Sequence, residues 1–91
     1  MEKKYILITN KNCGPCIRVK NHLDSEFPNW KEYVEVIDVS DISMKEWIVL
    51  KLKYKISYTP IMVKFENGKS EFIFSDYYPN KINDFIEQLK K

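Results

Sequence analysis

The chain has 91 residues, of which 44% are hydrophobic, and it carries a formal net charge of +2. This length predicts a single domain over residues 1–91, and the apolar share is enough for a packed core, which excludes a disordered chain. Lysines are scattered rather than gathered in the basic stripe of a nucleic-acid-binding surface, and no apolar run reaches membrane-spanning length. We therefore expect neither nucleic acid nor a membrane as a partner.

The N-terminal segment predicts a strand, a tight turn and a helix. Residues 4–9 are an apolar run that favours a β-strand. A helix is predicted over Gly14–Glu26, because apolar residues recur at positions 16, 19 and 23 with helical spacing and Pro28 follows its end. The motif Cys13-Gly14-Pro15-Cys16 therefore lies at a strand-to-helix turn, with Cys13 near the N-terminus of the helix.

The middle of the chain predicts a second strand and a second helix. Residues 33–39 are dense in β-branched side chains, which favours a strand. Ser43 and Glu46 have the spacing of a capping box, in which the serine caps the helix and the glutamate binds back to it. The helix that begins there is expected to bury one apolar face, formed by Met44, Trp47, Ile48 and Leu52.

The C-terminal part predicts a hairpin and a closing helix. Ile61–Phe65 and Glu71–Phe74 are typical of strands, and Asn67-Gly68 between them is a strong signal for a hairpin turn. Asn80 is expected to cap the last helix. The apolar face of that helix consists of Ile82, Phe85, Ile86 and Leu89.

The predicted order of elements is β-α-β-α-β-β-α, which defines an α/β fold. The first two strands are joined by a helical crossover and should be parallel, whereas the last two form an antiparallel hairpin. A four-stranded mixed sheet flanked by helices on both faces buries all of the apolar faces at once.

The two cysteines carry the predicted chemistry. Unpaired backbone N–H groups and the helix dipole favour an anion at a helix N-terminus, and the thiolate is the reactive form of cysteine. We therefore expect Cys13 to be the nucleophile, with its pKa lowered further by the cation of Lys11. Cys16 lies one helical turn further on, should be more buried and suits the resolving role, in which it attacks the mixed disulfide.

Two other interpretations of the cysteine pair stay open, namely inert buried thiols and metal ligands. A structural zinc site requires four ligands, and beyond the pair the chain offers His22 alone. Metal binding would therefore need two chains to pool their cysteines at an interface, and we expect no metal. His22 is expected to be a surface or partly buried helical residue rather than a base.

The chain resembles the thioredoxin-like superfamily over nearly its whole length. The resemblance rests on Cys13-Gly14-Pro15-Cys16 after the first strand, Tyr58-Thr59-Pro60 before the third, the turn at Phe65–Lys69 and the closing helix. The compact strand-first start is similar to glutaredoxins. The resemblance implies a thioredoxin-like fold and a cis bond at Thr59–Pro60, which lies against the disulfide and exposes the preceding backbone to a substrate strand.

The sequence departs from these families at several positions. Thioredoxins carry a tryptophan where this chain has Asn12, a buried aspartate where it has Leu7 and a glycine where it has Asp76. Glutaredoxins carry a Gly-Gly pair for glutathione at the place of residues 74–78, and this chain does not. The resemblance implies supporting or substrate-binding roles around the catalytic cysteines for Asn12, Gly14, Pro15, Tyr58, Thr59, Pro60 and Asp76.

Several of these residues have two interpretations. Asp76 either binds a substrate amine or caps the last helix, and Pro15 stiffens the disulfide ring or simply starts a helix. Three tyrosines in loops expected near Cys13 either line a substrate groove or pack against the rest of the protein, namely Tyr58, Tyr77 and Tyr78. Three others are expected in the core, namely Tyr5, Tyr33 and Tyr54.

The resemblance implies a thiol–disulfide oxidoreductase that reduces protein disulfides by dithiol exchange through Cys13 and Cys16, with a part in cell redox homeostasis and electron transport. The alternatives are a glutathione-dependent glutaredoxin and a non-catalytic binding subunit of the same fold. We expect no bound cofactor, an external reductant (thioredoxin reductase with NADPH, or glutathione), and a monomer. The N-terminus lacks the features of a signal peptide, which predicts a cytoplasmic location.

Overall fold

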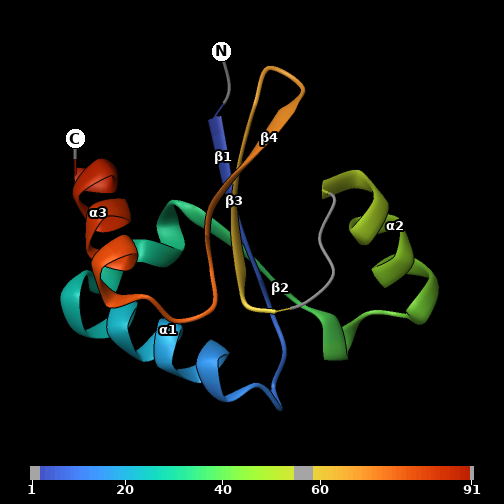
Figure 1. Cartoon of the computed structure of the whole chain (residues 1–91), viewed down its shortest axis with the longest axis horizontal. Coiled ribbons are helices and arrows are strands. Elements are labelled where there is room, and N and C mark those ends of the chain that lie inside the picture. The colour runs from blue at the N-terminus through green and yellow to red at the C-terminus, as the bar shows by residue number, and fades with distance from the viewer. Residues whose placement is uncertain (1–2, 55–58, 91) are drawn as a thin grey trace.

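The computed structural model describes residues 3–54 and 59–90 of the chain. Seven main elements follow one another, joined in part by two short 3-10 turns at Pro28–Glu32 and Val39–Asp41. They are β1 (Lys3–Thr9), α1 (Gly14–Glu26), β2 (Val34–Asp38), α2 (Met44–Tyr54), β3 (Ile61–Glu66), β4 (Lys69–Ser75) and α3 (Pro79–Lys90) (Figure 1). The predicted order β-α-β-α-β-β-α is confirmed, with boundaries that shift by one or two residues.

The four strands form one mixed sheet in the order β2-β1-β3-β4. β1 pairs in parallel with β2, so that Tyr5 lies opposite Val34, and it pairs antiparallel with β3. β3 and β4 form the predicted antiparallel hairpin, whose turn residues Asn67 and Gly68 both have positive φ. The sheet therefore has the parallel and antiparallel pairs expected from the sequence.

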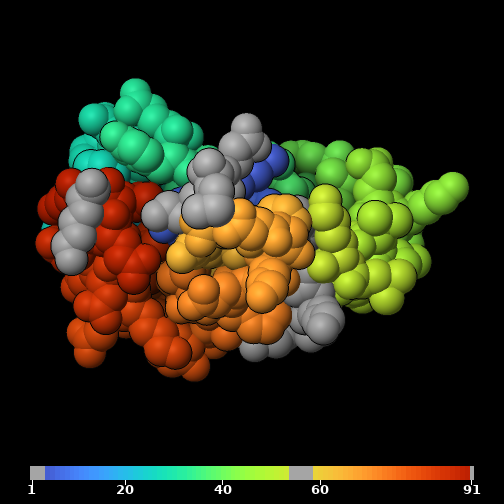
Figure 2. Space-filling view, turned by 90° about the horizontal axis from the view of Figure 1, so that it is seen from above, coloured from blue at the N-terminus to red at the C-terminus, as the bar shows by residue number. Residues whose placement is uncertain are grey.

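Helices cover both faces of the sheet. α1 and α3 lie on one face and α2 on the other, and the space-filling view shows α3 and α2 on opposite sides of the strands (Figure 2). Alternation along β1 divides the core accordingly, because Tyr5 and Leu7 face α1 and α3 whereas Ile6 and Ile8 face the other way. The larger cluster also contains Val19, Leu23, Trp30, Val34, Met62, Phe74, Ile82, Phe85 and Ile86.

The predicted buried face of α2 is wrong in part. Trp47 does pack against the sheet, together with Leu50, but Met44 and Leu52 are 71% and 77% exposed and Ile48 is exposed as well. α2 carries apolar residues on more than one side, so periodicity alone does not select the face that the sheet covers. The capping box is confirmed, since the Glu46 amide donates to Ser43 Oγ (3.1 Å) and the Ser43 amide donates to Glu46 Oε1 (3.4 Å).

The start of α3 also differs from the prediction. The helix begins at Pro79, and the Ile82 amide already donates to the Tyr78 carbonyl (3.0 Å), so Asn80 lies in the first turn and is not its cap. The reason is that a proline suits the first helical position, where no amide is needed. The predicted apolar face is confirmed, with Ile82, Phe85 and Ile86 buried and Leu89 packed against the same cluster.

Of the tyrosines predicted in the core, Tyr5 is buried, whereas Tyr33 is 50% exposed and stacks on Phe27. Tyr33 precedes β2 instead of starting it, so its side chain does not enter the sheet. The Tyr54 side chain lies outside the described part of the structure. Within residues 3–54 and 59–90, no helix combines the length and apolar composition that crossing a bilayer requires.

Candidate functional site

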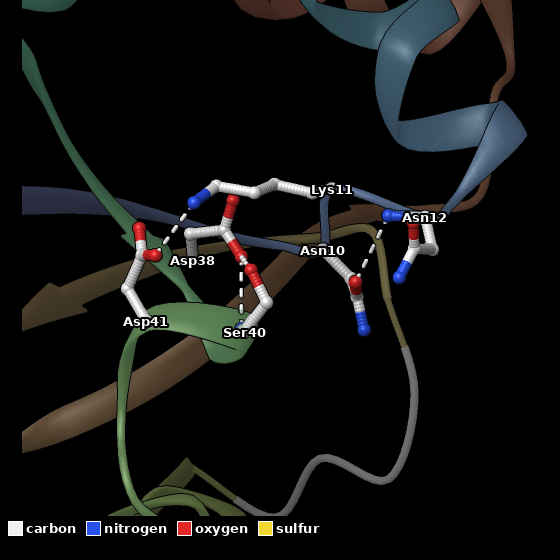
Figure 3. Close-up of polar contacts among 6 residues, drawn as sticks. All are labelled: Asn10, Lys11, Asn12, Asp38, Ser40 and Asp41. Carbon is white, nitrogen blue, oxygen red and sulfur yellow. Dashed lines mark hydrogen bonds and ion pairs between the residues drawn. The ribbon is translucent and has the colours of Figure 1, made fainter.

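The turn between β1 and α1 presents the two cysteines. It is closed by a hydrogen bond from the Cys13 amide to the Asn10 carbonyl (3.2 Å). A second bond, from the Asn12 amide to Asn10 Oδ1 (3.0 Å), is drawn in Figure 3. Cys13 is the N-cap of α1, and Pro15 lies in the first turn. The predicted place of Cys13 at the helix N-terminus is therefore confirmed.

Cys13 and Cys16 are joined in a disulfide, and their environments differ. Cys13 Sγ accepts a hydrogen bond from the Cys16 amide (3.2 Å), one of the N–H groups that a helix start leaves unpaired. The Cys13 side chain is half-buried, whereas Cys16 is 1% exposed. The sulfur of the less buried Cys13 already receives a backbone N–H and is arranged to hold negative charge, while the Cys16 sulfur is shielded.

The Thr59–Pro60 peptide bond is cis, as the resemblance implied, and it lies beside the disulfide. Cys13 Sγ is 3.7 Å from the Thr59 carbonyl oxygen, which brings together residues 46 positions apart. Thr59 is half-buried and Pro60 is buried. Tyr58, also expected at the site, lies outside the described residues.

Asp76 follows β4 and lies next to the cis-proline. Its amide donates to the Pro60 carbonyl (3.1 Å), and its φ of +72° is in the left-handed region, which is uncommon for a residue other than glycine. Its carboxylate accepts a hydrogen bond from the Tyr77 amide (2.7 Å), which lies outside α3. The side chain thus orders the turn before α3 instead of capping that helix, and its binding of substrate stays a prediction.

The two described loop tyrosines differ in their contacts. Tyr77 is half-buried, and its hydroxyl lies 3.2 Å from His22 Nδ1 on α1, which supports packing over groove lining. Tyr78 is 48% exposed, with the Lys81 ammonium over its ring. His22 also contacts Asn83 Oδ1 through Nε2 (2.7 Å), so it joins α1 to α3 and is half-buried as expected.

Lys11 does not present its charge to Cys13 as predicted. Its ammonium lies 2.7 Å from Asp41 Oδ1, and the side chain extends away from Asn12 and the start of α1 toward the end of β2 (Figure 3). The hydrogen bond and the charge of Asp41 raise the pKa of Lys11 above its ordinary range, with a smaller contribution from Asp38. Lys11 is thus paired with Asp41 in an ion pair, with Asp38 at the end of β2 beside it, and its charge is not directed at Cys13.

Asp38 completes this polar cluster beside the site. Burial raises its pKa, but hydrogen bonds from the Ser40 side chain and amide, with the charges of Lys11 and Lys20, outweigh burial and leave the pKa below its ordinary range. Sequence reasoning did not find this cluster. The only signal was two acidic residues near the end of a predicted strand, Asp38 and Asp41.

The surface next to Cys13 is open at the remaining predicted positions. Asn12 and Gly14 are exposed, and Pro15 is half-buried. A Cβ at Gly14 would have no neighbour within 4 Å, which leaves room for an approaching chain. Among the described residues no cluster of His, Cys, Asp or Glu is placed to hold a metal ion.

Thr9, which sequence reasoning missed as well, is the last residue of β1. Its side chain is fully buried, and Oγ1 has no hydrogen-bond partner in the described part of the chain. The signal in the sequence was a polar residue at a position where strand alternation calls for an apolar one.

Comparison with known proteins identifies the fold. No protein-family model and no curated protein sequence matches the chain, whereas solved structures match it over nearly its whole length. Oxidised thioredoxin from Plasmodium falciparum is 19% identical with a TM-score of 0.68, covering 99% of this chain and 83% of that one. Spinach chloroplast thioredoxin f is 11% identical with a TM-score of 0.67, and the match covers 99% of this chain and 78% of that one. Malassezia sympodialis thioredoxin is 23% identical with a TM-score of 0.66, and the match covers 94% of this chain and 73% of that one.

The protein therefore has the thioredoxin fold, as the sequence predicted. Within that fold its site is a Cys-Gly-Pro-Cys disulfide at the N-terminus of α1, faced by a cis-proline at the start of β3.

Proposed function

We propose that the protein is a thiol–disulfide oxidoreductase that reduces protein disulfides through Cys13 and Cys16. One observation carries this proposal. A half-buried cysteine at a helix N-terminus is bonded to a shielded partner and lies 3.7 Å from the carbonyl that precedes a cis-proline. Inert thiols would not need a backbone N–H directed at a half-buried sulfur or open space at Gly14.

In the first step the reduced Cys13 thiolate attacks one sulfur of a substrate disulfide. A Cys13–substrate bond forms, the substrate S–S bond breaks, and its electron pair leaves on the other substrate sulfur, which takes up a proton. The Cys16 amide and the N-terminus of α1 stabilise the attacking thiolate, because both direct positive ends of dipoles at Cys13 Sγ. The Thr59 carbonyl next to Cys13 is placed to pair with an extended substrate backbone.

In the second step Cys16 loses its proton and attacks Cys13 Sγ. The Cys13–Cys16 bond forms, the mixed disulfide breaks, and the second substrate sulfur leaves as a thiolate. Burial of Cys16 keeps it from competing for substrate, and its place one turn from Cys13 holds it within reach. An external dithiol or glutathione then reduces the disulfide, so no bound cofactor is required.

The test is reduction of insulin disulfides by the whole chain. One assay supplies thioredoxin reductase and NADPH, and another supplies glutathione with its reductase. We expect turnover in at least one assay, its loss in Cys13→Ser, and a trapped mixed disulfide in Cys16→Ser. Leu52→Ala serves as the control variant, because Leu52 is largely exposed on α2 and its replacement should leave folding and turnover unchanged. Absence of turnover in both assays would contradict the proposal.

The same experiment separates the alternatives. Turnover with glutathione alone would indicate a glutaredoxin. A binding subunit would retain its partner when both cysteines are serine, and would not reduce insulin. We further propose that the protein acts as a monomer in the cytoplasm, which sedimentation and cell fractionation can test.

A further inference from the structure

A buried hydroxyl at the end of β1, the strand that leads into the redox motif, has no hydrogen-bond partner in the described part of the chain. Thr9 is fully buried, and its Oγ1 is unpaired among the residues that the structure describes. An unpaired buried hydroxyl costs free energy, and valine would fill nearly the same volume without that cost. Such a group in a folded protein calls for an explanation.

The topology places Thr9 under the first turn of α1. Tyr5 and Leu7 face α1 and α3, so alternation along β1 directs Thr9 to that same face. Cys16 precedes Val19 by three residues and Leu23 by seven, and both of these pack on that face of the sheet. Since the turn after Thr9 leads directly into α1, Thr9 and Cys16 share one end of this layer.

Neighbouring strands frame the same position. Thr9 pairs with Asp38 on β2, and Pro60 directly precedes Ile61, the partner of Ile8 on β3. Asp38 is thus a titratable neighbour of Thr9 in the sheet, and its carboxylate accepts hydrogen bonds from Ser40 and is influenced by the charges of Lys11 and of Lys20 on α1. Leu7, where thioredoxins carry a buried acid, is fully buried and offers no polar atom.

We infer that the Thr9 hydroxyl serves the reduced state, in which it donates a hydrogen bond to the Cys16 sulfur and stabilises its thiolate. In the disulfide the Cys16 sulfur is neutral and a weak acceptor, and the Thr9 hydroxyl has no partner among the described residues. After reduction the same sulfur becomes a thiol, and on losing its proton to solvent a thiolate, which is a strong acceptor.

This inference rests on the proposed function and makes Thr9 a positioning residue for the resolving step. The hydroxyl gives no proton away. It lowers the free energy of the Cys16 thiolate, whose electron pair then forms the bond to Cys13 while the substrate sulfur leaves. It also favours the dithiol over the disulfide, because the hydroxyl is paired in the dithiol alone.

The first test titrates Cys16 directly. In a Cys13→Ser background Cys16 is the sole thiol of the chain, which has two cysteines, and thiolate ultraviolet absorbance follows its ionisation. We expect Thr9→Val to raise the midpoint by about one pH unit and Thr9→Ser, which keeps the hydroxyl, to leave it near the parent value. Ile8→Val, equally buried on the other face of β1, should leave the midpoint unchanged.

The second test measures the redox equilibrium of the native Cys13–Cys16 pair against glutathione. Thr9→Val should lower the equilibrium constant for forming the dithiol by about threefold, which corresponds to a reduction potential about 14 mV more negative for a two-electron couple. Thr9→Ser should restore the parent value. A purely structural role would change stability without moving either readout.

The inference is overturned if Thr9→Val matches the parent in the titration, or if Thr9→Ser behaves as Thr9→Val. Neither measurement requires substrate turnover. A parent protein that reduces insulin but shows no Thr9 effect would keep the proposed function and lose the role of Thr9. A Thr9 effect in a chain that fails to reduce insulin would keep the hydrogen bond from Thr9 to Cys16 and contradict the proposed function.

Discussion

At the scale of single residues, the two cysteines differ in exposure, and this difference predicts their reactivity. Cys13 is half-buried, and its Sγ accepts a hydrogen bond from the Cys16 amide, whereas Cys16 is 1% exposed. Substoichiometric iodoacetamide at neutral pH should therefore label the reduced protein at Cys13 at least roughly tenfold more than at Cys16. Peptide mapping measures the ratio, and label mainly on Cys16 would reverse the assigned roles.

The environment of Leu7 predicts that an acidic residue at this position would destabilise the fold. Leu7 is fully buried among apolar side chains, with Met62 paired to it on β3. Leu7→Asp should destabilise the fold by about 3–5 kcal/mol, because the acid would be buried without a partner, whereas Leu7→Met should cost less than about 1.5 kcal/mol. Urea unfolding measures both. Faster turnover in Leu7→Asp with little loss of stability would show that an internal base assists the resolving step.

Single residues also show where sequence reasoning fails. The place of Cys13 followed from local spacing, and the cis-proline followed from a resemblance. The partner of Lys11 did not, because Asp41 is 30 residues away and a lysine side chain reaches in several directions. The burial of Thr9 without a partner could not be predicted either, since satisfaction of a hydroxyl depends on atoms from several elements.

At the scale of elements, α2 offers a matched pair of leucines. Leu50 packs against the sheet, whereas Leu52 is 77% exposed, and both lie in the same helix. Leu50→Ala should lower the free energy of unfolding by about 1–2 kcal/mol, as expected for a half-buried leucine, and Leu52→Ala should stay within about 0.5 kcal/mol. Equal effects in urea unfolding would mean that α2 does not bind the sheet through Leu50.

Elements were predictable where one local signal dominates. The capping box at Ser43 and the Asn67-Gly68 turn are satisfied by neighbours within a few residues, so the sequence identifies them. The buried face of α2 and the first residue of α3 are decided by packing and by the fixed φ of Pro79, and there the expectations were wrong. The apolar face of α3 was predicted correctly, because its buried residues recur with helical spacing on one side of the helix.

At the scale of the whole molecule, the sheet separates a large core from a small one. The larger core joins α1, α3 and the sheet, and it fixes the layer in which Cys16 lies. The hydrogen bonds of His22 to Tyr77 and Asn83 connect that layer across α1, the β4–α3 turn and α3. The site is thus assembled by the fold from three separate segments, around residues 13, 60 and 76, which local sequence patterns alone do not bring together.

The charged cluster at the edge of the sheet contributes to the pH dependence of stability. The pKa of Asp38 is lowered in the folded protein, so its contribution is present above the ordinary carboxyl range and is lost as pH falls through the folded pKa. The pKa of Lys11 is raised, so its contribution is present below the ordinary lysine range and is lost as pH rises through the folded pKa. The two contributions therefore coexist over the neutral range.

Substitutions that keep shape and remove charge test this assignment. Asp38→Asn retains an acceptor for Ser40, so urea unfolding should show a deficit against the parent at neutral pH that closes as the pH falls. Lys11→Met should show a deficit that closes as the pH rises. Both deficits should be small and should shrink in high salt, since the groups are largely solvated. A deficit of Asp38→Asn that widens toward acid would mean that the Asp38 pKa is raised in the folded protein, and that burial outweighs the bonds from Ser40.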